Sequence, residues 1–140
     1  MIVDRTTEFG QRAAARLEQE KTGWLTTITA GGQPKSIPVW FLWQEDESLL
    51  LYSQPDQLKL RNIEVNPRVS FNLDSDGNGG NIVRLEGPAE LPADYPLGST
   101  IPGYVEKYRD LIPALNMTVE EMTATYSRAI IIRPERLAGH

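Results

Sequence analysis

The spacing of apolar residues first separates helical segments from extended ones. Between residues 4 and 21, Phe9, Ala13 and Leu17 recur at every fourth position among Arg, Gln and Glu, which predicts an amphipathic helix. We expect Gly23 to end this helix, because glycine favours helix termination. Three further helices are expected, over residues 56–65, 104–111 and 118–126, the last of which begins with the capping-box spacing of Thr118 and Glu121.

Short runs rich in Val, Ile, Thr and aromatic residues lie between these helices and predict six strands. They cover residues 24–30, 35–43, 48–53, 68–74, 81–91 and 127–134. The turn sequences GGQP and QEDES join the first three strands as successive hairpins. Such succession favours an antiparallel barrel over a parallel sheet with crossover helices. We therefore expect a single domain over residues 1–140, mostly β, with short flanking helices.

The predicted strand 35–43 is apolar on both of its faces. Alternation places Ile37, Val39, Phe41 and Trp43 on one face, and Pro38, Trp40 and Leu42 on the other. A barrel interior covers only one of them, so the other needs a partner subunit or a flat apolar ligand. The alternative interpretation, which fits the pattern equally well, is a central strand covered by the first helix. Pro38 cannot donate to a neighbouring strand, which suits an edge or a break in the barrel wall.

Composition excludes several kinds of chemistry. The 140 residues include no Cys, so thiol catalysis and disulfides are excluded, and the only His is the terminal His140. The sequence from Asp74 to Gly79 matches half of a calcium loop, but Leu85 stands where the bidentate Glu is required. We interpret it as a hairpin loop. An enzyme without these groups is expected to obtain its chemistry from a cofactor.

Charge and hydropathy bear on partners and location. The net charge of −5 argues against a nucleic-acid-binding surface, which is normally basic. No apolar run has the length of a signal peptide core or a membrane span, so we expect a cytoplasmic protein. Residues 94–103 are rich in Gly and Pro and are a candidate for a mobile loop. Tyr104 and Tyr108 lie four residues apart, which favours packing within a helix.

Lys59 stands at an unusual place for a cation. The segment SQPDQLKLRNIEVNPRV puts it in the first turn of the helix predicted near Asp56, where the macrodipole is positive. An anion bound at this helix end reverses the argument, because free N–H groups there bind phosphate. Ser53, just before the helix, supplies a further hydroxyl, whereas Arg61 points roughly the other way. The alternative is that Lys59 is an ordinary solvated lysine.

The order GWLTTITAGGQPKSIPVWFLW, LLLYSQPDQLKLRNIEVNPRVSF and VRLEGPAEL resembles the FMN-binding split barrel superfamily, also called pyridoxamine 5'-phosphate oxidase-like. The resemblance is strongest to the branch of small F420-dependent reductases, and it covers residues 10–91 and 127–137. It implies a six-stranded antiparallel split β-barrel that forms a homodimer, with two cofactor sites at the subunit interface. The most specific part is the run S-x-P-x-x-x-K-x-R-N-I-x-x-N-P.

The resemblance also implies site residues. The Lys59 segment would hold the cofactor phosphate, and the tricyclic ring would lie against the strand around Val39. The cofactor-binding residues so implied are Ile37, Pro38, Val39, Trp40, Ser53, Gln57, Leu58 and Lys59. Relatives often carry Arg at the position of Gln57, so this chain has one positive charge fewer at the phosphate.

These expectations combine into one functional hypothesis. The chain is expected to be an F420H2-dependent reductase of an unidentified organic substrate, with FMN as the alternative cofactor. A second alternative is a flavin- or haem-binding carrier without turnover. The resemblance does not extend to the longer C-terminal region of true pyridoxamine phosphate oxidases, so that activity is not expected. The catalytic residues, and whether residues 94–113 form a lid, stay open at this point.

Overall fold

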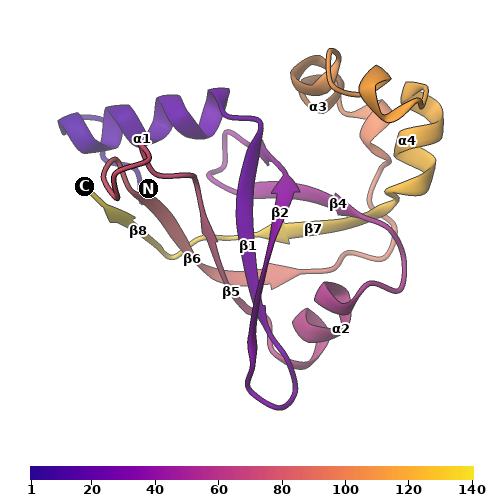
Figure 1. Ribbon diagram of the computed structural model, residues 1–140, viewed down its shortest axis with the longest axis horizontal. Helices are drawn as coiled ribbons and strands as arrows, with labels where there is room; N and C mark the ends of the chain where they lie inside the picture. The colour runs from indigo at the N-terminus through magenta and orange to yellow at the C-terminus, as the bar shows by residue number, and fades with distance from the viewer.

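Eight strands form one curved, entirely antiparallel sheet that closes into a half-barrel (Figure 1). The computed structural model describes residues 1–140. The spatial order is β2-β1-β5-β6-β7-β4-β3, and β8 pairs with β6. The strands are β1 (Thr22–Ile28), β2 (Pro34–Trp40), β3 (Leu42–Trp43), β4 (Leu49–Ser53), β5 (Arg68–Asn72), β6 (Val83–Glu90), β7 (Arg128–Ile132) and β8 (Arg136–Gly139).

Four α-helices and two short 3₁₀ turns surround the sheet. They are α1 (Glu8–Gln19), α2 (Leu58–Val65), η1 (Gly98–Thr100), α3 (Pro102–Tyr108), η2 (Pro113–Leu115) and α4 (Val119–Thr125). Figure 1 shows α1 at one end of the half-barrel, with α3 and α4 at the other end above α2. We call residues 98–126, which hold α3 and α4, the cap. None of the helices combines the length and the apolar composition that crossing a membrane requires.

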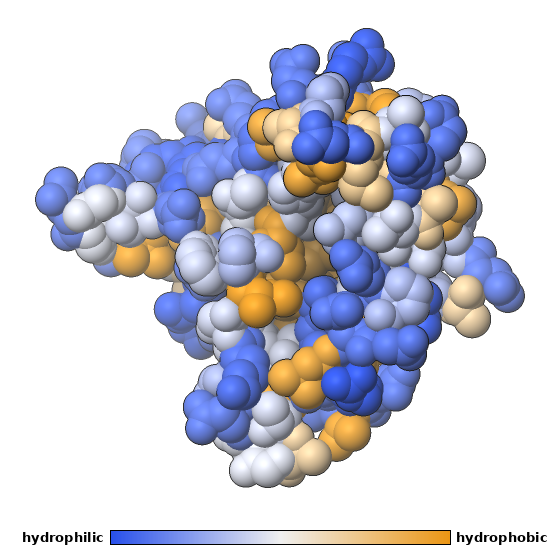
Figure 2. All heavy atoms as spheres, turned by 45° about the vertical axis from the view of Figure 1, so that its right-hand side comes forward, coloured by the Kyte–Doolittle hydropathy of each residue, from blue (hydrophilic) through white to orange (hydrophobic).

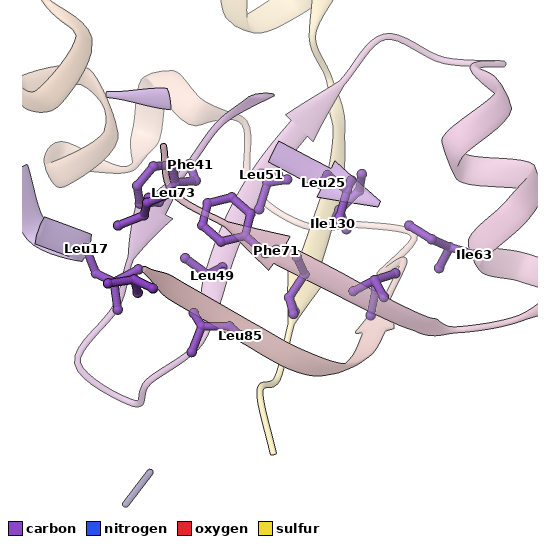
Figure 3. Packing of buried hydrophobic residues seen from close by; sticks show 14 of the residues in the cluster. Leu17, Leu25, Phe41, Leu49, Leu51, Ile63, Phe71, Leu73, Leu85 and Ile130 are labelled. Atoms are coloured by element: carbon purple, nitrogen blue, oxygen red, sulfur yellow. The ribbon is translucent and has the colours of Figure 1, made fainter. Parts of the chain in front are cut away.

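The interior of the half-barrel is filled by one cluster of apolar side chains (Figure 3). Phe41 and Phe71 meet edge to face, with ring centroids 4.9 Å apart. Leu17 from α1 and Ile63 from α2 contribute from outside the sheet. The cap has a separate small core formed by Tyr104, Tyr108, Ile112 and Met122. Each core buries its own apolar surface, which stabilises the half-barrel and the cap as packed units.

The predicted six-stranded barrel is corrected to eight strands. One added strand is β8, which pairs with β6 through residues 136–139 and is too short, at four residues, to be recognised from its sequence. The other arises because the predicted strand 35–43 is interrupted at Phe41. The Phe41 N–H donates to the Tyr108 hydroxyl at 2.7 Å, and its carbonyl accepts from Lys107 Nζ at 2.5 Å. Side chains of α3 thus replace strand partners at this residue.

Gly23 does not end the first helix as predicted. The helix ends at Gln19, and Gly23 lies within β1, opposite Val39 on β2. A Cβ atom at this position would lie 2.2 Å from Cζ of Phe71, so only glycine allows the core ring to approach the strand so closely. Glycine is therefore required at position 23 for packing against Phe71 and not for helix termination.

The second face of the strand around Trp40 is covered by the chain's own cap. The Trp40 ring stacks on Tyr108 at 4.3 Å and 3° between planes, and Leu42 packs against the core of the cap. The cap therefore covers part of the face for which the sequence had suggested the first helix, a partner subunit or a flat ligand. β2 is an edge strand, as Pro38 predicted.

Two loop predictions also have outcomes in the structure. The Asp76 carboxylate accepts hydrogen bonds from the amides of Asn78 and Gly80, so the loop closes on itself as a hairpin turn. The segment after residue 94 is tied to the sheet, because the Tyr52 hydroxyl donates to the Pro96 carbonyl at 2.6 Å. Gly98 is buried beside Tyr104.

Candidate functional site

A pocket of about 400 Å³ opens between the half-barrel, α2 and the cap. This volume lies in the range of small-molecule sites. Figure 2 shows apolar residues gathered in a hollow at the centre of the face on which the cap and α2 approach each other. The lining residues are Thr22, Pro38, Val39, Trp40, Tyr52, Lys59, Tyr104, Leu115, Met122 and Tyr126.

Lys59 is the only charged residue in this lining. It lies in the first turn of α2, as predicted, although the helix begins at Leu58 rather than near Asp56, and its side chain is half-buried. It makes neither an ion pair nor a hydrogen bond within the chain. Burial lowers the pKa of its ammonium group, because charge is less stable away from water. An anion bound in the pocket would compensate the ammonium group for the contact with water that it loses on burial.

The start of α2 carries no group that competes for an anion. Its N-cap residue Gln57 makes no side-chain cap bond, and no acidic residue occupies the first turn. The amides of Leu58 and Lys59 donate to no other group of the chain. Free N–H groups, the positive dipole end and a cation therefore coincide at one helix terminus.

β2 supplies the opposite wall with Pro38, Val39 and Trp40. The Trp40 ring in this wall is held in place by its stack on Tyr108. Since β2 is an edge strand, its outer backbone groups have no strand partner at this position. A planar ring placed here would meet apolar side chains and open backbone, which suits a flat heteroaromatic ligand.

Three tyrosines line the pocket, two of them contributed by the cap. Tyr52 and Tyr104 contact edge to face at 5.1 Å. Burial raises the pKa of Tyr52 to about 12, and that of Tyr104 still further. Both phenols therefore stay protonated at neutral pH and act as neutral hydrogen-bonding groups.

The structure brings together four of the eight residues that the sequence assigned to cofactor binding. Pro38, Val39, Trp40 and Lys59 share the pocket. Ile37, Ser53, Gln57 and Leu58 lie outside its lining. Ser53 is buried and donates to the Gln54 carbonyl at 2.8 Å, while Leu58 and Ile37 are among the more exposed apolar residues.

Sequence reasoning missed the other wall of the pocket. Tyr104 was predicted to pack within a helix, which it does, but it also lines the pocket. Met122 and Tyr126 gave no signal, because they lie more than 60 residues after Lys59 and meet it only in the folded chain. Tyr52 was recognisable in principle, since it brings a polar hydroxyl directly after the three leucines of β4.

Comparison with known structures agrees with this architecture. A candidate pyridoxamine 5'-phosphate oxidase of Listeria innocua is 23% identical with a TM-score of 0.69, covering 91% of this chain and 94% of that one. An F420 reductase is 25% identical with a TM-score of 0.66, covering 89% and 94%. A haem-binding protein of Mycobacterium smegmatis is 19% identical with a TM-score of 0.65, covering 94% of this chain but 53% of that protein.

Comparison with protein families covers nearly the whole chain. A search of curated proteins found no match. Residues 9–140, which include every strand, the pocket and the cap, match the family described as pyridoxamine 5'-phosphate oxidase. The curved antiparallel sheet, the α2 segment and the similar structures all agree with that match, and the chain belongs to the pyridoxamine 5'-phosphate oxidase family.

Proposed function

We propose that the chain is an oxidoreductase that binds the deazaflavin coenzyme F420 in this pocket and reduces an organic substrate. The observation that carries the proposal is Lys59, a half-buried cation without a partner at the start of α2. Burying an unpaired charge is costly, so the site is built for an anion. F420 and FMN both carry a phosphate joined through a ribityl chain to a planar tricyclic ring.

The remaining lining fits the rest of such a coenzyme. Pro38, Val39 and Trp40 would flank the ring, and the amides of Leu58 and Lys59 would donate to the phosphate. Gln57 leaves one charge fewer there than Arg would. Ile37 and Ser53 border the site in this proposal without lining the pocket of the single chain.

The bound coenzyme would supply hydride, and the chain would supply position and a dry environment. Seven of the ten lining residues are hydrophobic, which excludes water and holds a ring in one orientation. We propose F420 rather than FMN because the similar F420 reductase reaches 25% identity over 89% of this chain.

A haem-binding carrier is the competing proposal, motivated by the similar fold of the haem-binding protein. The chain offers no histidine at the pocket, because its only one is His140, next to β8. A haem iron would therefore need a different axial ligand, such as Tyr126.

Absorbance titration separates these proposals. The purified protein is titrated in parallel with F420, FMN and haem, whose spectra differ. We expect saturable binding of F420 at the lowest concentration, with one equivalent per chain. Tighter binding of FMN would change the cofactor but keep the oxidoreductase proposal. Tighter binding of haem, or no binding of either flavin-type coenzyme, would overturn it.

A further inference from the structure

Tyr104 is a buried residue whose hydroxyl has no partner within the chain. Only 2% of this residue is exposed, yet its hydroxyl makes no hydrogen bond within the chain. The hydroxyl oxygen is not completely enclosed by protein atoms, so it still faces open space. Since Tyr104 lines the pocket, the pocket is the space to which the hydroxyl is open.

The ring of Tyr104 is held rigidly. It meets Tyr52 edge to face at 5.1 Å and Tyr108 at 5.3 Å. On another side Gly98 approaches so closely that a Cβ there would lie 3.0 Å from the ring. A fixed hydroxyl in an apolar wall determines the orientation of a ligand, because an unsatisfied buried donor costs free energy. Burial keeps this phenol protonated, so it is available as a donor.

The rest of the cap wall carries no charge. Leu115, Met122 and Tyr126 complete it, and Lys59 is the only charged group anywhere in the lining. If Lys59 holds the coenzyme phosphate, as proposed above, no group remains to neutralise a charged substrate. A charged substrate would then lose its hydration without compensation.

We propose that Tyr104 binds the organic substrate by donating a hydrogen bond to a carbonyl oxygen, and that this substrate is an uncharged planar carbonyl compound. The aromatic rings of Tyr52, Tyr104 and Tyr126 form the surface on which such a molecule lies. This inference rests on the proposed function, since it assigns the cap wall to the substrate and the β2 and α2 walls to the coenzyme.

A matched pair of probes tests the proposal without turnover. The complex with oxidised F420 is titrated by calorimetry with 9-fluorenone, a neutral planar ketone, and with 9-fluorenone-2-carboxylate. We expect the ketone to bind at least tenfold more tightly than the carboxylate. In Tyr104→Phe, which keeps the packed ring and removes only the hydroxyl, we expect ketone affinity to fall about tenfold, with F420 affinity unchanged within twofold.

Tyr95→Phe is the control, because it also removes a tyrosine hydroxyl but lies outside this pocket. It should match the wild type in both titrations, and circular dichroism should show both variants folded. Equal ketone affinity in Tyr104→Phe and wild type, equal affinity for both probes, or loss of F420 rather than ketone binding would overturn the inference. If F420 does not bind the wild type at all, the proposed function fails. The same ketone titration of the protein alone then decides the role of Tyr104.

Discussion

Lys59 combines three features that are rarely found in one lysine: a place in the first turn of a helix, partial burial and no partner. Truncating it should therefore affect binding far more than folding. We expect Lys59→Ala to weaken F420 binding by about 1.5–3 kcal/mol, as for a hydrogen bond to a charged group. Fluorescence titration of the coenzyme measures this change.

Arg61→Ala is the matched control for Lys59→Ala. Arg61 lies on the same helix, but its exposed guanidinium donates to the Asp56 carbonyl at 2.8 Å and takes no part in the pocket. Its removal should change F420 affinity by much less. A larger loss in Arg61→Ala than in Lys59→Ala would place the phosphate at another site.

Lys107 should make stability depend on pH. Burial, reinforced by the neighbouring charge of Lys21, lowers the pKa of Lys107 to about 7, although Glu20 partly opposes the shift. Between that value and the ordinary lysine pKa, the unfolded chain binds more protons than the folded one. The free energy of unfolding should therefore rise with pH above about 7, by at most about 1.4 kcal/mol per pH unit.

Urea unfolding at about pH 7, 8 and 9 tests this linkage. Lys107→Met keeps an unbranched apolar chain over the Phe41 ring, from which the ammonium group lies 3.6 Å. The variant should lose most of the rise that the wild type shows. The same pH dependence in both proteins would assign the rise to another group.

At the scale of elements, the junction between α3 and the strand break holds the cap on the half-barrel. The Tyr108 hydroxyl accepts from the Phe41 amide and donates to the Lys21 carbonyl at 2.5 Å. Tyr108→Phe should leave the buried Phe41 amide and the part-buried Lys21 carbonyl without this partner and lower the free energy of unfolding by about 1–3 kcal/mol. Denaturant unfolding measures the loss.

Tyr104→Phe provides the comparison for that experiment, because the same kind of atom is removed from the same helix. Its hydroxyl makes no bond within the chain, so its loss should cost little stability. The two variants thus separate a hydroxyl that holds the fold from one that faces the pocket. Equal destabilisation of both would argue against the distinction.

Element types were predictable from sequence more reliably than element ends. Periodicity identified every helix and most strands because it reflects which residues are buried. The start of α4 was predictable, because Thr118 and Glu121 form a capping box within four consecutive residues. The end of β2 was not, because Phe41 leaves its strand to bond with Tyr108 of α3. A local pattern does not contain a bond to a residue 67 positions away.

At the scale of the whole molecule, the open edge of the half-barrel predicts association. β2 has no neighbour on its outer side, and Ile37 and Leu58 expose 36% and 45% of their surfaces. We expect a two-fold homodimer with an apolar interface of above about 2,000 Å² in total. Light scattering at micromolar concentration should give twice the mass of one chain.

Ile37→Glu tests where this interface lies. The residue is exposed in the single chain, so the change should leave the fold intact by circular dichroism while shifting the mass towards the monomer. A monomeric wild type would refute the dimer. A dimer that Ile37→Glu does not weaken would place the interface on another face.

The sequence by itself determined the features that depend on neighbouring residues and on overall pattern. These are the antiparallel β-architecture, the family, the edge position of the strand with Pro38, and the placement of Lys59 in the first turn of a helix. Each follows from local periodicity, from proline chemistry or from a motif whose residues are close together in the chain.

Only the tertiary structure decided what covers each surface. It showed that the cap packs on Trp40, and that Tyr104, Met122 and Tyr126 complete the pocket with Val39 and Lys59. These contacts join segments more than 40 residues apart. Their sequence patterns are those of ordinary helix packing, because the same apolar and aromatic side chains serve a core and a ligand wall equally well.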